Sequence, residues 1–493
     1  MEWFQAPEYW LSRFLFERVL AAVYLVAFVV VVNQFRPLLG ERGLLPVPDL
    51  LRRTGFWHTP SLFHVRYSDR LVVVVAWAGV GLAASLIVGL PQRGPAWVPM
   101  LVWFALWALY LSIVNVGYTW YSFGWESLLC EAGALAIFLG PADTPPPVLV
   151  VFLMRWLLFR VEVGAGLIKL RGDPCWRDLT CLQYHHETQP MPNPLSWRFH
   201  HLPRWAHKVE VGANHFAQLV VPFGLFAPQP VASIAGAIIL ATQAWLVLSG
   251  NFSWLNVVTI ALALFALSDS TLELVLPFER PDQGATPTWF AVGVIALAAL
   301  VAVLSWLPVR NLVSRGQRMN LSFNRFHFVG TYGAFGHITR ERNEIVLEGT
   351  DDDVPTANST WKAYELKGKP GDPARRPPQI APYHLRLDWL MWFAAMGPPA
   401  RHPWLVTVVQ RLLAGDGPTL RLLRHNPFPD RPPRYVRARL YRYRFTTREE
   451  RRRTGAWWER TLLGPYLPPL RLDPGGAGGV IRAGPGPGPV RTP

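Results

Sequence analysis

Long apolar segments separated by short polar connections constrain this chain more than any other feature. A run of about twenty apolar residues is long enough for a helix to cross the hydrocarbon core of a bilayer. Such runs lie at residues 14–33, 70–90, 97–115, 124–140, 148–170, 211–227, 231–249, 253–275 and 288–307. Only 16% of the residues are charged, against about a quarter in soluble domains. The sequence therefore predicts an α-helical polytopic membrane bundle of about nine spans.

The character of the chain changes after Pro308. Strand-like alternation occurs in NEIVLEGT, TWKAYELKG and PRYVRARLYRYRF, and an amphipathic helix is predicted at 403–414, ended by Gly415. We therefore assign residues 1–310 to the membrane domain and residues 315–472 to a β-rich α+β extramembrane domain. The tail at 473–493 is rich in glycine and proline and is predicted to be disordered, because it cannot bury enough apolar surface.

Charged side chains occur within the predicted spans, where each costs about 2.5–3.5 kcal/mol on insertion scales. Helix 148–170 carries Arg155, Arg160, Glu162 and Lys169, and a spacing of seven places the first, third and fourth of them on one stripe. Polar side chains available on other spans are Glu126, Glu131, Asn214, His215, Gln218 and Gln243. Two interpretations stay open: a polar chamber that binds or transforms a molecule, and internal salt bridges that fix helix packing.

The polar connection at 171–208 is the most unusual loop of the chain. It contains Cys175, Trp176, Cys181, His185, His186 and Asn193. The spacing C-x5-C-x3-H-H matches no common zinc module, so we expect no metal. A disulfide between the two cysteines would require an oxidising compartment, and a Cys–His nucleophile lacks a visible orienting group. The prolines of TQPMPNPLSW predict an extended segment, and we interpret the loop as a rigid lid across the bundle.

Two motifs of the predicted extramembrane domain are also candidates. In VGTYGAFGHITRERNEI the residues of interest are Tyr332, Gly333, Phe335, Gly336 and Arg340. The glycines permit a tight turn or a close backbone approach, either for a binding surface or for a strand packed on the bundle. The alternating charges that follow, through Glu344, suggest a solvated strand end. In LRLDWLMWFAAM, a buried pair of Arg386 and Asp388, beside Trp389, could dock the segment onto the membrane domain.

The formal charge of +15 indicates acidic partners. Basic residues concentrate in the loops and in the C-terminal third, and no nucleic-acid-binding signature accompanies them. We therefore expect membrane lipids, and not nucleic acid, as the partner of the basic surface. The short loops on the side of the lid and the C-terminal domain are the more basic ones, which favours the cytoplasm for that side.

Four blocks of sequence resemble the lipase maturation factor family of multi-pass membrane proteins. The blocks are GLIKLRGDPCWRDLTCLQYHHETQPMPNPLSW, RMNLSFNRFHFVGTYGAFGHITRERNEIVLEGTDD, PPQIAPYHLRLDWLMWFAAM and WWERTLLGPYLPPL. They follow the family's order and cover most of the chain. The first block is also faintly similar to the transmembrane core of the vitamin K-dependent γ-carboxylase superfamily.

The resemblance implies a protein of the endoplasmic reticulum membrane that helps secreted clients such as lipases to fold, through a C-terminal domain on the lumenal side. It implies no catalytic residue set and no evident cofactor, and an enzyme is not expected. The γ-carboxylase similarity implies the alternative, a membrane enzyme acting on a lipid or a lipid-soluble cofactor. The arginine- and proline-rich style and the absence of a retrieval tetrapeptide fit a bacterial homologue in an inner membrane. No oligomeric state is assigned.

Overall fold

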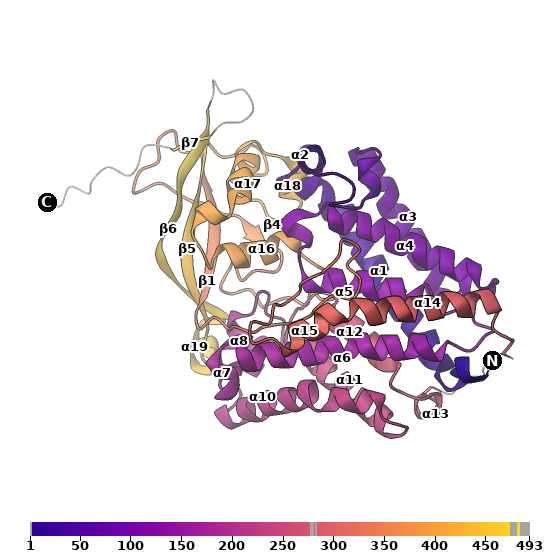
Figure 1. The fold of residues 1–493 in the computed structure, drawn as a ribbon. Coiled ribbons are helices and arrows are strands. Elements are labelled where there is room, and N and C mark those ends of the chain that lie inside the picture. The colour runs from indigo at the N-terminus through magenta and orange to yellow at the C-terminus, as the bar shows by residue number, and fades with distance from the viewer. Residues whose placement is uncertain (1, 277–280, 282, 474–480, 484–493) are drawn as a thin grey trace.

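The computed structural model describes residues 2–276, 281, 283–473 and 481–483. A set of helices forms one part of the molecule, and a β-sheet with its own helices lies at one end of this set (Figure 1). The helices of the first part are α1 Trp10–Leu39, α2 Val47–Arg53, α3 Asp69–Ile87, α4 Trp97–Asn115, α5 Gly124–Ala136, α6 Val148–Arg171, α7 Pro174–Arg177, α8 Leu182–Thr188, α9 Ser196–His200, α10 Arg204–Leu219, α11 Val231–Ser249, α12 Leu255–Leu264, α13 Asp269–Leu272, α14 Thr288–Leu304 and α15 Trp306–Val313.

The expected count of nine spans is not confirmed. Among the described residues, five helical segments are long and apolar enough to cross a membrane: Pro7–Leu39, Asp69–Ile87, Trp97–Asn115, Val231–Ser249 and Thr288–Val313. Three other apolar runs form helices that are too short, because α5 has 13 residues, α12 has 10 and α10 has 16. Nearly every residue of α5 is buried. Apolar sequence alone cannot separate such buried helices from spans.

Helix α6 lies at the centre of the helical part. It is 24 residues long and packs against α5, α10, α12 and α14. Its charged residues leave it outside the set of apolar spans, although its length would allow a crossing. Because its neighbours surround it, these charges meet side chains and carbonyl groups of the protein. Helix α1 packs in the same way against α3, α5 and α12.

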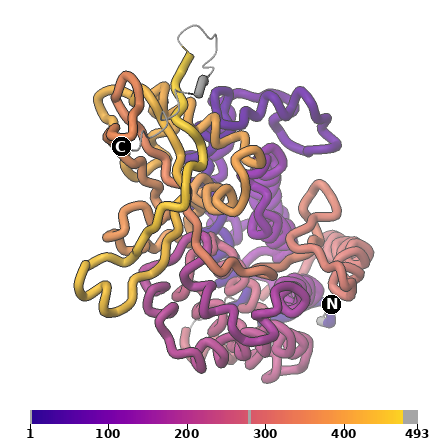
Figure 2. Tube along the Cα trace, turned by 90° about the vertical axis from the view of Figure 1, so that its left-hand side faces the viewer, coloured from indigo at the N-terminus to yellow at the C-terminus, as the bar shows by residue number. Residues whose placement is uncertain are grey.

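The second part is built on an antiparallel sheet of strand order β2-β1-β5-β6-β7. Its strands are β1 Arg342–Thr350, β2 Lys362–Ala363, β5 Tyr435–Phe445, β6 Trp458–Leu472 and β7 Ile481–Ala483, beside a second pair, β3 Glu365–Leu366 and β4 Leu423–His425. Its helices are α16 Arg386–Ala394, α17 Pro403–Leu413, α18 Gly417–Leu420 and α19 Arg448–Thr454. The turned view of Figure 2 shows the same sheet, in orange to yellow, beside the helices.

Alternation of buried and partly exposed side chains explains the central strand, β5. In β5, Val436 and Ala438 are fully buried, and Arg437 between them is partly exposed. The buried face meets α17, which also packs on β6. The helix has the predicted position, and Gly415 after it has a positive φ of 64°, a conformation that favours glycine.

The charges from Arg340 to Glu344 are only partly a solvated strand end. Arg340 and Glu341 are exposed, but Arg342 and Glu344 are buried and form an ion pair of 2.6 Å with each other. Lys369 lies 3.0 Å from the same carboxylate. The predicted disordered tail lies mostly outside the described residues, but three of its residues form β7 on the edge of β6.

Candidate functional site

A cavity of about 1060 Å³ lies where the helical part meets the C-terminal part. Its lining comes from α6, α10, α11, α16, the lid (residues 171–208) and the loop at 330–339. Apolar and aromatic side chains form most of the wall, with a few polar groups among them. Large apolar cavities with a small number of placed polar groups are typical of small-molecule sites.

Two charged residues of α6 are among the polar groups of the wall. Nζ of Lys169 donates to Asn214 Oδ1 (2.9 Å) and to Gln218 Oε1 (2.8 Å). About two helical turns before Lys169, Glu162 accepts a hydrogen bond from Gln243 Nε2 at 2.7 Å. Both charged side chains are buried and line the cavity. The sequence placed these five side chains on facing spans, and the structure brings them together around a space.

The remaining members of the predicted polar cluster lie elsewhere. Arg160 forms a buried ion pair with Glu131 of α5. Arg155 donates to the carbonyl groups of Phe265 (2.8 Å) and Leu225 (3.0 Å), so the stripe with a spacing of seven is not one continuous site. His215 Nε2 lies 3.0 Å from the carbonyl oxygen of Trp176. These contacts join the helices and the lid to one another.

Glu126 links the two parts of the molecule. Its Oε1 lies 2.8 Å from Nη1 of Arg386 at the start of α16, and Tyr110 donates to its Oε2. Asp388 is therefore not the partner of Arg386, contrary to the expectation. Residues two apart on a helix point in different directions, and Asp388 instead accepts from the backbone N–H of Gly368 at 2.5 Å. Burial raises the pKa of Asp388 to about 6.

The lid begins with a disulfide between Cys175 and Cys181, whose Cα atoms are 4.8 Å apart. The bond closes a short loop around α7 and excludes these sulfurs from metal binding or nucleophilic attack. His185 packs on Phe252 and Phe335, with ring centroids 6.0 and 4.9 Å away. Burial lowers its pKa to about 3, so His185 is a neutral aromatic part of the cavity wall.

The proline segment of the lid lies between the two parts of the molecule. Asn193 donates to the carbonyl group of Leu248 at the end of α11 (2.9 Å), which holds the segment on the helices. On the other side, Arg342 of β1 donates to the carbonyl groups of Glu187 (2.9 Å) and Pro190 (3.1 Å). Glu187 lies in the last turn of α8, where carbonyl groups have no partner within the helix, and Pro190 lies in the extended segment that follows.

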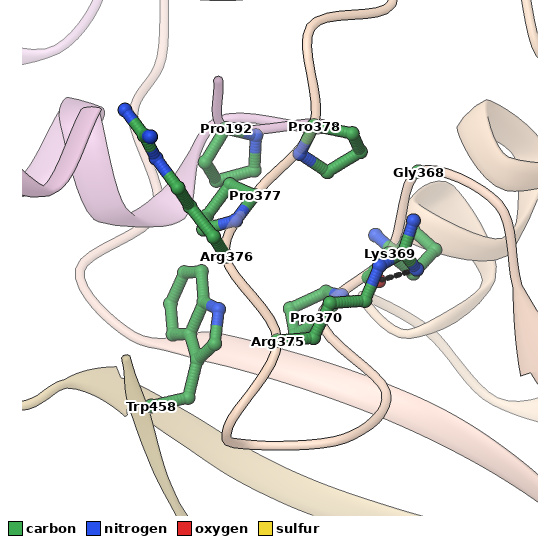
Figure 3. Close-up of a pocket in the computed structure, with 9 residues that line it drawn as sticks. All are labelled: Pro192, Gly368, Lys369, Pro370, Arg375, Arg376, Pro377, Pro378 and Trp458. Carbon is green, nitrogen blue, oxygen red and sulfur yellow. Dashed lines mark hydrogen bonds between the residues drawn. The ribbon is translucent and has the colours of Figure 1, made fainter. Parts of the chain in front are cut away.

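Figure 3 shows the contact of this segment with the C-terminal part. Pro192 lies beside Pro377 and Pro378, and Trp458 of β6 faces the same small pocket. Asn251 donates to the carbonyl groups of both Pro192 (3.2 Å) and Pro378 (3.0 Å). The lid is therefore packed on both faces, as a rigid connector would be.

The glycine-rich motif packs as a loop, and not as a strand, along α6. Tyr332 and the N–H of Gly330 both donate to Glu131, at 2.6 and 3.0 Å. Further along, the carbonyl oxygen of Gly336 accepts from the N–H of Asp173 at 2.8 Å, and Arg340 pairs with the same Asp173 at 2.7 Å. Tyr332, Gly333, Phe335 and Gly336 all line the cavity, so the loop closes it on one side.

Sequence reasoning missed several residues of the site. Trp389 was expected only as a docking group, and it lines the cavity together with Trp392 and Trp125. His207 and Glu210 of α10 were not singled out, although a His-x-x-Glu spacing places both on one helix face. His384 was also missed; it lies 3.5 Å from Glu126, and no local pattern marks it.

Comparison with known proteins identifies the family. A model of the lipase maturation factor transmembrane domain matches residues 11–274, and a model of the lipase maturation factor C-terminal domain matches residues 328–468. The chain belongs to the lipase maturation factor family. Lipase maturation factor 1 of Homo sapiens is 44% identical over 94% of this chain and 88% of its own length. The protein of that name from Mus musculus is 42% identical over 94% of this chain and 88% of its own length.

A second branch of the family is more distant. Lipase maturation factor 2 of Homo sapiens is 29% identical over 94% of this chain and 83% of its own length. No solved structure matches the chain. The two family models divide the chain as the structure does, into a membrane part and a C-terminal part with a sheet. Nearly all of the residues that line the cavity lie within the two matched segments.

Proposed function

We propose that this protein is a membrane-embedded maturation factor for secreted lipases, and that the client contacts its C-terminal domain. The observation that carries the proposal is the similarity to lipase maturation factor 1, which extends over 94% of the chain at 44% identity. A location in the endoplasmic reticulum membrane, or in an inner membrane for a bacterial member, belongs to the same proposal. The disulfide of the lid agrees with an oxidising compartment on that side of the membrane.

The edge of β6 supports the C-terminal domain as the client surface. The strand spans Trp458–Leu472, but β7 pairs only with residues 470–472 among the described residues. Residues 459–463 are exposed, including Leu462 and Leu463 at 44% and 43%. A free strand edge with exposed apolar side chains can pair with an extended segment of another chain. A folding client offers such segments before its own sheets are complete.

Point variants test this proposal better than deletion of the domain, because deletion would leave Glu126 buried without Arg386. We would express a secreted lipase in cells that lack their own maturation factor and add this protein or its variants. The measurement is secreted lipase activity per amount of lipase protein. Leu462→Lys and Leu463→Lys together should reduce activity several-fold. Val354→Lys, an exposed apolar position outside β6, is the matched control and should match wild type.

Two results would count against the proposal. If the wild-type chain does not raise secreted activity above that of empty vector, the maturation role is wrong for this client. If wild type is active and the double variant equals it, the role stands but the β6 edge is not the client surface. Membrane insertion and protein level are measured for each variant, so that loss of expression is not read as loss of client contact.

The cavity favours a second candidate, an enzyme or binding protein for a lipid or a lipid-soluble molecule. Its volume of about 1060 Å³ is at the upper end of small-molecule sites, which span roughly 300–1,000 Å³. Glu162 and Lys169 would supply its charges. Mass spectrometry of molecules that copurify with wild type and with Glu162→Gln tests this candidate. If both proteins are folded and the same molecules copurify with each, Glu162 has no role in binding them.

A further inference from the structure

Three metal-ligating side chains converge beneath the lid, outside the contacts described above. They are His186 of α8 and, one helical turn apart on α10, His207 and Glu210. Nε2 of His186 lies 3.5 Å from Glu210 Oε2, and Nδ1 of His207 lies 3.9 Å from the same oxygen. The three ligand atoms all lie within 4.8 Å of one another. The two imidazoles are almost fully buried, at 1% and 2% exposure.

The ligand atoms of this cluster lack hydrogen bonds. Among the described residues, none bonds to either ring nitrogen of His186, to Nδ1 of His207 or to Oε2 of Glu210. Buried polar atoms in folded proteins are almost always satisfied, by protein, water or an ion. Both imidazoles lie within ion-pair distance of the same carboxylate oxygen, but at 3.5 and 3.9 Å these contacts are longer than hydrogen bonds normally are. The arrangement therefore calls for a group that accepts electron pairs from all three.

The remaining polar atoms of two ligands are held in the way that metal ligands usually are. Glu210 accepts at its other oxygen, Oε1, from Nε1 of Trp245 at 2.7 Å. His207 donates from its other nitrogen, Nε2, to the carbonyl oxygen of His200 at 3.4 Å. Metal-bound histidines commonly donate their second N–H to a carbonyl or carboxylate, which fixes the tautomer and the ring orientation.

We propose that His186, His207 and Glu210 form a binding site for a divalent transition-metal ion, with Zn²⁺ as the best match. Imidazole and carboxylate ligands suit Zn²⁺, which binds them at about 2.0–2.2 Å. Tetrahedral bonds of that length separate ligand atoms by about 3.3–3.6 Å, so the trio needs a contraction of less than about 1.5 Å at its widest pair. A disulfide-bonded Cys175 and Cys181 are not part of this donor set.

The position of the site gives it two consequences. It would join α8 to α10, which begins within the lid and continues beyond it through Glu210, so that a bound ion would hold α8 on α10. His186 and Glu210 also line the large cavity, so an ion held by them would lie at the wall of that space. Three protein ligands and one open position are the pattern of zinc sites that accept water or a ligand oxygen.

Metal content of the purified full-length protein, prepared without a polyhistidine tag, tests the proposal. The protein in detergent is loaded with Zn²⁺ and dialysed against a weak chelator. Its zinc content per chain is then measured by inductively coupled plasma mass spectrometry. We expect about one Zn²⁺ per chain in wild type and in His201→Gln, a control histidine of the same lid that lies outside the trio. His207→Gln and Glu210→Gln should lose the ion. Trp245→Phe, which removes only the second contact of Glu210, should bind Zn²⁺ about 10–100-fold more weakly.

The outcomes separate binding from folding. Near-ultraviolet circular dichroism reports whether each variant keeps its side-chain packing. If His207→Gln or Glu210→Gln unfolds, Trp245→Phe still tests the proposal, because it leaves all three proposed ligands in place. Visible absorption of Co²⁺ in place of Zn²⁺ should show four-coordinate nitrogen and oxygen ligation in wild type and in His201→Gln, and should be lost in His207→Gln and Glu210→Gln. Equal zinc in wild type and the ligand variants, or no zinc in folded wild type after loading, overturns the proposal.

Discussion

The ion pair of Glu126 and Arg386 joins the membrane part to the C-terminal part, and its removal has a predictable cost. Both side chains are 0% exposed, and Arg386 also donates to the carbonyl oxygen of Trp120 at 2.6 Å. Its guanidinium lies 3.4 Å from the ring centroid of Tyr121. Removing one member of a buried pair leaves an uncompensated charge and costs about 3–5 kcal/mol. We expect this loss of unfolding free energy in Glu126→Gln and in Arg386→Met.

The double variant tests the reasoning, because it removes both charges. Its cost should fall below the sum of the single costs by about 2–3 kcal/mol, the upper part of the range of about 0.5–3 kcal/mol for coupling between residues in contact. Tryptophan fluorescence during unfolding in mixed detergent micelles measures these free energies. Arg442→Met with Glu341→Gln is the matched control, because both side chains of that pair are about half exposed, at 47% and 53%, and such pairs contribute about 0–1 kcal/mol. Additive costs for the buried pair would refute the argument.

Two further predictions concern single positions. Burial raises the pKa of Asp388 to about 6, so the folded protein binds this proton more tightly than the unfolded chain, and protonation stabilises it as the pH falls from about 7 to 4. Asp388→Asn does not gain this stability. Its free energy of unfolding minus that of wild type should therefore fall by up to about 3 kcal/mol as the pH falls over that range. A difference that stays constant with pH would contradict the prediction. A Cβ at Gly172 would lie 2.1 Å from Gly336 O, so Gly172→Ala should cost about 1–3 kcal/mol in thermal unfolding, whereas Gly55→Ala, with open space around it, should not.

Spacing within one helix predicted part of the site. Glu162 and Lys169 share a stripe because seven residues are nearly two turns, and facing amides were visible on other apolar segments as partners. The pairing of Arg386 could not be found in this way. The nearest carboxylate in sequence is that of Asp388, but the true partner, Glu126, is 260 residues away. Docking of α16 against α5 sets this contact, and no local pattern records it.

The count of nine spans is not confirmed, for a related reason. Hydropathy measures how apolar a segment is, and a helix buried by other helices is as apolar as one that faces lipid. Helix α5 shows this, since its 13 residues are nearly all buried in the protein. Helix α6 is the opposite case: it is long enough to cross a membrane, but it carries charged side chains, which contact polar groups of the neighbouring helices. Strand β5 was predictable because one of its faces is more buried than the other, which gives a period of two and needs no knowledge of the partner strand. Strand β1 is buried at nearly every position, so burial gives it no such period.

The lid shows most clearly why chemistry could be recognised in the sequence but not assigned. Cysteines and histidines within a few residues suggested one joint site, yet the cysteines bond to each other and the two histidines have different surroundings. His185 packs among aromatic rings, whereas His186 meets His207 and Glu210 from α10. The direction of each side chain depends on one short helix, α8, held between the bundle and β1. A ligand set made from two elements can therefore be recognised only after both elements are placed, even when its His-x-x-Glu half is visible in the sequence.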